Sequence, residues 1–160
     1  MRIGVVSDTH SREIPAEMLE DFKETELIIH AGDFCTPKDL ETFRRIKEVR
    51  AVYGNMDGAD LRRVLPRREV LALEGVTVGV FHGEGPRERI LETVQKEFRD
   101  QKVDAVVFGH SHQPFNKEIN GVLYFNPGSP NDGITAPYLS YGVLEIKSGK
   151  IKGKIIKLKG

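Results

Sequence analysis

Seven side chains of kinds that bind divalent metal ions each follow closely on a short apolar run. They are Asp8, His10, Asp33, Asn55, His82, His110 and His112. Carboxylate and amide oxygens with imidazole nitrogens, and no thiolate, suit Mn²⁺, Fe²⁺, Co²⁺, Ni²⁺ or Zn²⁺ better than a soft metal. If the apolar runs are buried strands, a sheet can collect all seven side chains from distant positions. The set therefore predicts a site for a pair of metal ions.

The individual motifs differ in how specifically they indicate a metal. Asp8 and His10 at spacing i, i+2 can point the same way, yet a capping aspartate and a surface histidine explain that pair equally well. Asp33 and Asn55 follow glycines, where turn-forming residues are common.

The histidines indicate a metal site more specifically than these motifs do. His82, His110 and His112 all follow predicted strands, and histidine is scarce, with 5 in the chain. His30 lies inside a predicted strand, so we interpret it as a packed, hydrogen-bonded core residue and leave it out of the metal set.

The elements that must position these residues follow from hydrophobic spacing and turn signals. The predicted strands are residues 2–7, 27–32, 49–53, 69–73, 76–81, 103–108, 115–119, 122–126, 141–146 and 150–159. Predicted helices cover 14–23 and 86–98, and a third begins after Thr36 as N-cap with Pro37 at its first position. The first half predicts a βαβαβ parallel sheet, and the whole favours two sheets face to face with helices outside. Lys150, Lys152 and Lys154 indicate a solvated edge strand.

Composition narrows the class of protein. The 160 residues are expected to form one domain, 1–160. With 24 basic and 24 acidic residues, the net charge of 0 does not favour nucleic-acid or membrane binding. The single cysteine and the lack of a signal-peptide pattern or a long apolar run predict a cytoplasmic protein without a membrane span.

The joint order Asp-x-His, Gly-Asp, Gly-Asn, His-Gly and Gly-His-x-His over residues 8–112 resembles the calcineurin-like metallophosphoesterase superfamily. The short chain and Asn126-Pro127-Gly128-Ser129 are similar to its small YfcE-like phosphodiesterase branch. The resemblance implies an α/β fold, a four-layer α/β/β/α sandwich of two mixed sheets flanked by helices.

The resemblance also implies roles for the ligands. Asp8, His10, Asp33 and His112 would hold the first metal, and Asp33 would bridge to a second, held also by Asn55, His82 and His110. Asp33, Asn55 and His82 would act in catalysis through two divalent ions, Mn²⁺ foremost. The expected activity is hydrolysis of small-molecule phosphodiesters by a metal-bound hydroxide. Related small proteins form dimers or tetramers, so a homodimer or homotetramer is a fair expectation.

Charge agrees with that activity independently of the family. Two dications carry four positive charges, whereas Asp8 and Asp33 supply two negative ones. A site that keeps about two positive charges favours hydroxide and phosphate, and paired metals can clamp both oxygens of an in-line displacement.

Two positions depart from the family pattern. Met56 stands where many members carry a histidine that helps the leaving group depart, and Glu84 stands where small members often carry another. Glu84 is a candidate proton donor, although a surface carboxylate is the simpler interpretation. The sequence therefore predicts faster turnover of aryl than of alkyl diesters.

Four further features have both a functional and a structural interpretation. Cys35 is expected to be a small buried apolar residue. Arg12 and Arg87 could reach a phosphate, but solvated surface arginines are the simpler interpretation. The turn at 126–129 could shape the substrate rim or be only a turn.

An alternative to the enzyme is a non-catalytic metal-binding scaffold for protein interactions on the same fold, like the retromer subunit related to this family. The complete ligand set favours the enzyme. A nuclease is a weaker third hypothesis, because the sequence shows no basic groove pattern.

Overall fold

Two five-stranded mixed sheets lie face to face in the computed structural model, which describes residues 1–159. Gly160, the last residue of the predicted domain, lies outside the described residues. In spatial order the first sheet contains β10 (Lys150–Lys157), β9 (Ser140–Lys147), β1 (Arg2–Val6), β2 (Leu27–His30) and β3 (Val49–Ala51). The second contains β4 (Arg68–Leu73), β5 (Val76–Phe81), β6 (Ala105–Val107), β8 (Val122–Asn126) and β7 (Phe115–Ile119).

Parallel strands form the centre of the second sheet and one side of the first, where β3 is the edge strand. β1, β2 and β3 are parallel neighbours, as are β5, β6 and β8. The hairpin strands β4, β7, β9 and β10 add antiparallel pairs at the margins. The carboxyl ends of the parallel strands in an open α/β sheet are where ligand sites form, and every predicted metal ligand follows one of the parallel strands.

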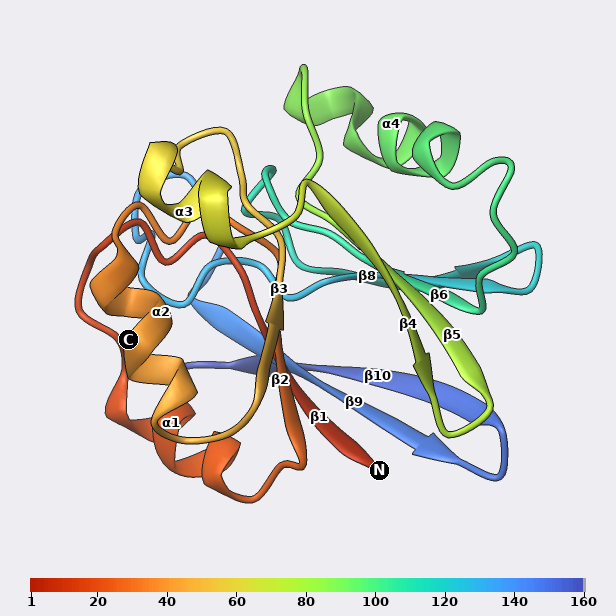
Figure 1. Cartoon of the computed structure of the whole chain (residues 1–160), viewed down its shortest axis with the longest axis horizontal. Helices are drawn as coiled ribbons and strands as arrows, with labels where there is room; N and C mark the ends of the chain where they lie inside the picture. The colour runs from red at the N-terminus through yellow and green to blue at the C-terminus, as the bar shows by residue number, and fades with distance from the viewer. Residues whose placement is uncertain (160) are drawn as a thin grey trace.

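Helices cover the outer faces of the sheets, which Figure 1 shows as layers. They are α1 (Ala16–Lys23), α2 (Pro37–Arg44), α3 (Ala59–Val64) and α4 (Ile90–Glu97), the last preceded by the 3₁₀ turn η1 (Arg87–Arg89). Helices α1 and α2 pack on the first sheet and α4 packs on the second. The predicted four-layer α/β/β/α sandwich is confirmed.

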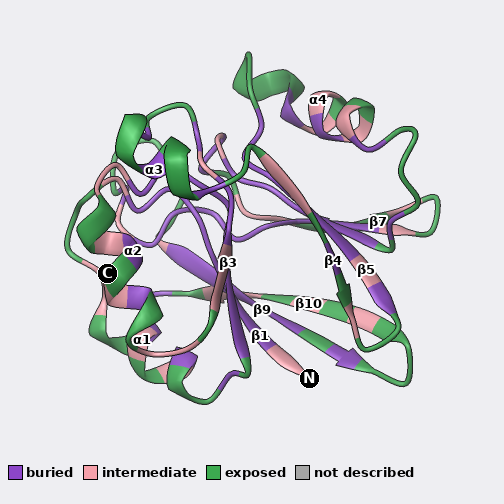
Figure 2. Ribbon diagram, in the orientation of Figure 1, coloured by how far each residue is buried: buried purple, intermediate pink, exposed green. Residues whose placement is uncertain are grey.

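Burial on both faces explains the continuous apolar runs of the central strands. Along β2, Leu27 and Ile29 point into the core between the sheets, whereas Ile28 points towards Phe22 and Phe43 under the helices. Because side chains alternate along a strand, both directions must be apolar. Figure 2 shows the central strands buried and the outward helix faces exposed.

Several predicted boundaries shift inward. Strands 2–7 and 27–32 end earlier than predicted, at Val6 and His30, and strand 103–108 is shortened at both ends to Ala105–Val107. The 14–23 helix begins only after Pro15, and the 86–98 helix opens as η1. Thr36 occupies the predicted N-cap position, but its side chain makes no cap hydrogen bond. The short helix α3 was not predicted.

The turn and edge predictions hold. The hairpin 115–119 and 122–126 has the predicted bounds, and Asn120 and Gly121 both adopt positive φ, at 50° and 81°, as an Asn-Gly hairpin turn requires. β10 is an edge strand of the first sheet, and its Lys150, Lys152 and Lys154 are exposed. Within residues 1–159, no helix is long and apolar enough to cross a membrane.

Candidate metal centre

Asp8 lies at the centre of the converging ligands. It follows β1 and is fully buried, and its Oδ1 atom faces three imidazoles. The distances from this oxygen to Nε2 of His112, His10 and His82 are 3.3, 3.5 and 3.8 Å. One carboxylate oxygen is thus shared by ligands from both sheets.

Asp33, which follows β2, joins the same group. Its Oδ2 lies 3.2 Å from His82 Nε2 and 3.6 Å from His10 Nε2, so it stands between a ligand of the predicted first metal and one of the second. Its Oδ1 accepts a hydrogen bond of 2.8 Å from the backbone N–H of Met56. Only one of its oxygens is therefore turned to the imidazoles.

Asn55 and His110 complete the set. The Asn55 Oδ1 lies 3.1 Å from both His82 Nε2 and His110 Nδ1. The Nε2 atoms of His10 and His112 are 3.2 Å apart. All seven predicted ligands are therefore brought together in one continuous cluster.

Three imidazoles have their outer nitrogen held by an acceptor. Nδ1 of His82 donates to the Ala31 carbonyl at 2.8 Å, and Nε2 of His110 donates to the Gly85 carbonyl at 2.8 Å. Nδ1 of His112 contacts Asp132 Oδ2 at 2.5 Å. When the outer nitrogen carries the proton, the inner one presents a lone pair, which is the arrangement that metal-binding histidines use.

An unpartnered polar atom tests whether a cation fits. Asp8 Oδ1 is buried and has no hydrogen-bond partner among the described residues. Burial by itself would raise the pKa of Asp8, but His82, His10 and His112 hold it well below its usual value. Burial would likewise lower the pKa of His82, whereas Asp8 and Asp33 raise it to about 9. The carboxylates thus favour positive charge among them, and the donor set fits divalent cations.

The backbone around the ligands is strained. Five of the seven ligands adopt a positive φ between 49° and 69°, namely Asp8, His10, Asp33, His110 and His112. Non-glycine residues rarely occupy this region, and such conformations cluster at functional sites because the surroundings must enforce them. Strand pairing therefore stops before the ligands, which explains the early ends of β1 and β2.

The glycines in the ligand motifs allow close approach. A Cβ at Gly54 would lie 2.2 Å from Asp33 Oδ1, and one at Gly109 would lie 2.0 Å from Ser7 Oγ and 2.7 Å from Asp8 Oδ2. Glycine is thus required before Asn55 and before His110 because any side chain there would collide with neighbouring ligand loops.

Replacing Gly109 by alanine is expected to destabilise the fold and weaken metal binding. The added methyl group would push on Ser7 and Asp8 in a closed environment, at a cost of about 1–3 kcal/mol. Chemical denaturation and a metal titration measure the two effects. Gly58→Ala is the matched control because nothing lies within 4 Å of its added Cβ; equal stability of the two variants would contradict the steric account.

Asp57 organises two ligand loops, a role that the sequence reasoning did not assign. It is buried, and its Oδ2 accepts hydrogen bonds from the backbone N–H groups of Asp33 and Gly54 at 2.9 and 2.8 Å. Its Oδ1 accepts from Cys35 N–H at 2.7 Å. A carboxylate two residues after Asn55 was the only sequence signal for this role.

Asp132 is a second residue that the sequence reasoning missed. It lies in the loop between β8 and β9, is 5% exposed, and accepts hydrogen bonds from His112, the Thr135 hydroxyl and the backbone N–H groups of Ile134 and Thr135. Burial by itself would raise the pKa of Asp132, but these hydrogen bonds hold it far below its usual value. A charged carboxylate thus orients His112.

Asp132→Asn is expected to weaken metal binding by about 10- to 100-fold, because the neutral amide no longer favours the required tautomer and orientation of His112. Competition with a chelator of known affinity measures the change. The exposed Asp100→Asn serves as control; unchanged affinity in both variants would show that Asp132 has no such role.

The turn at 126–129 supports the ligands from within the protein. Asn126 and Ser129 are fully buried. The Asn126 amide donates to the Gly109 carbonyl at 3.1 Å, and the Ser129 hydroxyl donates to the Asp8 carbonyl at 2.9 Å. The interpretation of this turn as a substrate rim is therefore wrong for these two side chains.

The structure confirms the prediction for His30 but not the one for Cys35. His30 is the predicted core residue: it is fully buried, accepts from Gly32 N–H at 3.1 Å and lies 3.2 Å from the Thr9 hydroxyl. Cys35 is half-buried, and its sulfur lies 3.6 Å from His10 Nδ1. The expectation of a simple buried apolar cysteine is wrong, because the loop turns the thiol towards a predicted ligand.

Neither departure from the family pattern places an acid among the ligands. The Met56 side chain is 57% exposed. The Glu84 side chain is 63% exposed and pairs with Arg67 at 3.5 Å, while it lines a surface pocket that also includes Asn55 and His82.

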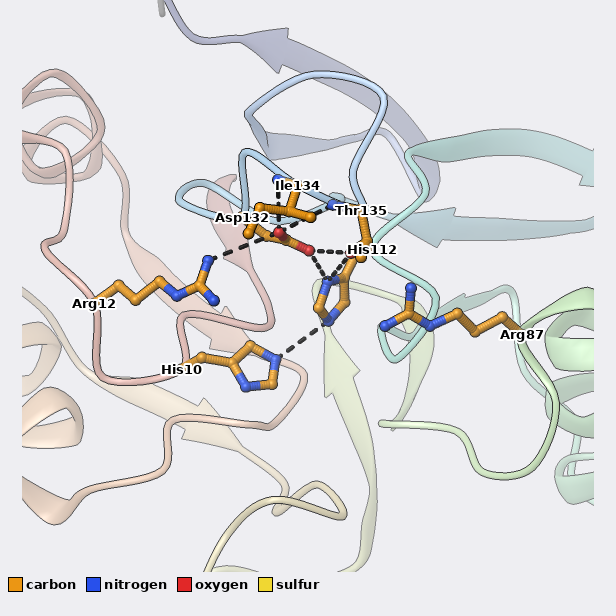
Figure 3. A pocket seen from close by; sticks show the side chains of 7 residues that line it. All are labelled: His10, Arg12, Arg87, His112, Asp132, Ile134 and Thr135. Carbon is orange, nitrogen blue, oxygen red and sulfur yellow. Dashed lines mark hydrogen bonds and ion pairs between the residues drawn. The ribbon is translucent and has the colours of Figure 1, made fainter.

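Arg12 and Arg87 line a cleft together with His10 and His112. Figure 3 shows the two guanidinium groups reaching towards this cleft from opposite sides. Both are exposed, as expected of surface arginines, and their place beside His10 and His112 leaves a contact with phosphate as a prediction.

The comparisons with known proteins agree with this geometry. A family model described as the calcineurin-like phosphoesterase superfamily domain matches residues 1–149. A probable metallophosphoesterase of Methanothermobacter thermautotrophicus is 35% identical, over 98% of this chain and 92% of the relative. A phosphodiesterase of Methanocaldococcus jannaschii is 29% identical, over 80% and 83%. Among solved structures, Vps29 of Entamoeba histolytica in complex with Zn²⁺ matches with a TM-score of 0.75 and 25% identity, over 98% and 99%.

A two-sheet sandwich with carboxylates and imidazoles gathered at its strand ends is the architecture of the metallophosphoesterase class. This chain belongs to the calcineurin-like phosphoesterase superfamily, as its ligand motifs predicted.

Proposed function

We propose that this protein hydrolyses phosphodiesters at a site that holds two divalent metal ions. The observation that carries the proposal is the buried, unpartnered Oδ1 of Asp8 within 3.8 Å of three imidazole nitrogens. Two groups of candidate ligands share this aspartate, Asp8 with His10 and His112, and Asp8 with Asp33 and His82.

The proposed assignment follows the family pattern. Asp8, His10, Asp33 and His112 hold the first ion, and Asp33, Asn55, His82 and His110 hold the second. The position of Asp33 Oδ2 between His10 and His82 supports a bridging role. Mn²⁺ is the proposed ion, and Ni²⁺, Co²⁺, Fe²⁺ and Zn²⁺ suit the same donors.

Each part of the proposed reaction has a physical basis. Two bound dications supply an activated water and about two net positive charges for a phosphate. Asp132 and the Ala31 and Gly85 carbonyls keep the imidazoles oriented. Asp57 holds the backbone of the two loops that carry Asp33 and Asn55, and such preorganisation limits the rearrangement needed during the reaction.

The fold likeness to Vps29 supports the alternative of a non-catalytic metal-binding scaffold. The enzyme is favoured because all seven ligands are present and converge. A small-molecule substrate, the absence of nucleic-acid binding, a cytoplasmic location and a homodimer or homotetramer stay predictions from the sequence.

A hydrolysis assay over several metals tests the proposal. Metal-free protein is loaded with each ion in turn and offered a phosphomonoester, a phosphodiester and a cyclic nucleotide. We expect hydrolysis of the diester, with Mn²⁺ the most effective ion. Metal-loaded protein that turns over none of these substrates would support the scaffold instead.

A further inference from the structure

A cleft of about 220 Å³ opens directly beside the proposed first metal ion. It is lined by His10, Arg12, Arg87, His112, Asp132, Ile134 and Thr135. Pockets for whole drug-sized ligands measure about 300–1,000 Å³. The cleft therefore suits one substituent of a substrate whose scissile phosphate lies at the metals.

Two arginines from different layers of the fold face this cleft. Arg12 extends from the loop after His10, and Arg87 is the first residue of η1 above the second sheet. Figure 3 shows both pointing inward on either side of His112. Guanidinium groups present several donors in a planar fork that matches phosphate oxygens.

The positive charge of these arginines is poorly balanced. Arg87 makes no ion pair within the part of the chain that the structure describes. Arg12 lies 3.7 Å from Asp132 Oδ1 and donates to the Asn131 carbonyl at 3.3 Å. Asp132 is already engaged by His112 and Thr135, so it neutralises the pair only in part.

The scissile group of a diester does not need this additional charge. A phosphodiester carries one negative charge, and two dications with Asp8 and Asp33 already leave about two positive ones. Arg12 and Arg87 add two more next to the metals, of which the Asp132 carboxylate offsets one. An anion beyond the scissile phosphate would balance the remaining charge.

We propose that Arg12 and Arg87 bind a second phosphate group on the substrate, carried by the part attached to the scissile phosphodiester. This inference rests on the proposed function and narrows its substrate class to phosphodiesters that bear a further phosphate. Arg87 is the main specificity-determining residue, since no carboxylate within residues 1–159 pairs with it.

A matched pair of substrates tests the inference. Thymidine 5′-(p-nitrophenyl phosphate) and its 3′-phosphorylated counterpart share one leaving group and differ by a single phosphate. The Mn²⁺-loaded protein should show a kcat/KM about 10- to 100-fold higher for the phosphorylated substrate, the gain expected of charged hydrogen bonds. Arg87→Ala should remove most of this preference, Arg12→Ala part of it, and the neighbouring Arg89→Ala none.

Two outcomes would overturn the inference: equal kcat/KM for both substrates, or equal losses on both substrates in Arg87→Ala. A binding experiment tests the phosphate subsite independently of the proposed hydrolytic function. Calorimetry on the Mn²⁺-loaded protein compares thymidine 3′,5′-bisphosphate with thymidine 5′-phosphate. If the bisphosphate binds more tightly in an Arg87-dependent way while neither p-nitrophenyl diester is hydrolysed, the phosphate subsite is supported and the proposed enzyme activity is refuted. Equal binding of the two nucleotides would refute the subsite.

Discussion

Asp33→Asn is expected to lower diester hydrolysis by about 10²–10³-fold and to reduce the bound metal from two ions to one. The substitution removes one of two carboxylates that offset two dications, and the lost electrostatic stabilisation amounts to several kcal/mol. Asp33 Oδ2 faces both His10 and His82, so both predicted ions would lose a ligand. Metal content by elemental analysis and kcat on an aryl diester measure the two effects.

The exposed Asp60→Asn is the matched control, because it changes the same charge on a side chain that pairs with Arg63 and not with a ligand. Its side chain is 78% exposed, so neither metal content nor rate should change. Full activity with two ions in Asp33→Asn would refute the bridging role.

Aryl diesters are expected to react faster than alkyl diesters by the full intrinsic difference between the two leaving groups, because no positioned acid narrows that difference by raising the alkyl rate about 10²–10⁴-fold. A positioned acid contributes a factor of this size for a poor leaving group and little for a phenolate that departs unaided. The side chains at the two relevant positions, Met56 and Glu84, are mostly exposed, and Glu84 pairs with Arg67.

Met56→His provides the complementary variant. It restores an imidazole directly after Asn55, at a position exposed enough to accept it, and should narrow the aryl–alkyl gap chiefly by raising the alkyl rate. Side-by-side assays of one aryl and one alkyl diester decide the matter. Equal rates on the two diesters in the unmodified protein would mean that an effective acid is present.

The seven residues that converge in the structure could be singled out from the sequence because each follows a predicted strand. Continuous apolar runs predict β1, β2, β5 and β6 as strands buried on both faces. The carboxyl ends of parallel strands lie at the same edge of their sheet, which brings the residues after them together. The four-layer fold and the seven residues of the cluster could thus be predicted from local patterns in the sequence.

The residues that orient the ligands were not predictable in the same way. Asp132 lies twenty positions after His112 in an irregular loop, and its contact with His112 depends on how that loop folds back. Arg12 and Arg87 face the same cleft because the loops that carry them, one beside each sheet, are brought together when the sheets pack. Helix α3 was missed because its six residues bury only Leu61, too little for a periodic signal.

The central claim is that two metal ions at the seven-residue cluster create a phosphodiesterase. Titrating metal-free protein with Mn²⁺ while following hydrolysis of an aryl phosphodiester tests it most directly. We predict activity that rises with added metal and saturates at two ions per chain. Two tightly bound ions per chain without hydrolysis, or hydrolysis that persists in the metal-free protein, would contradict the claim.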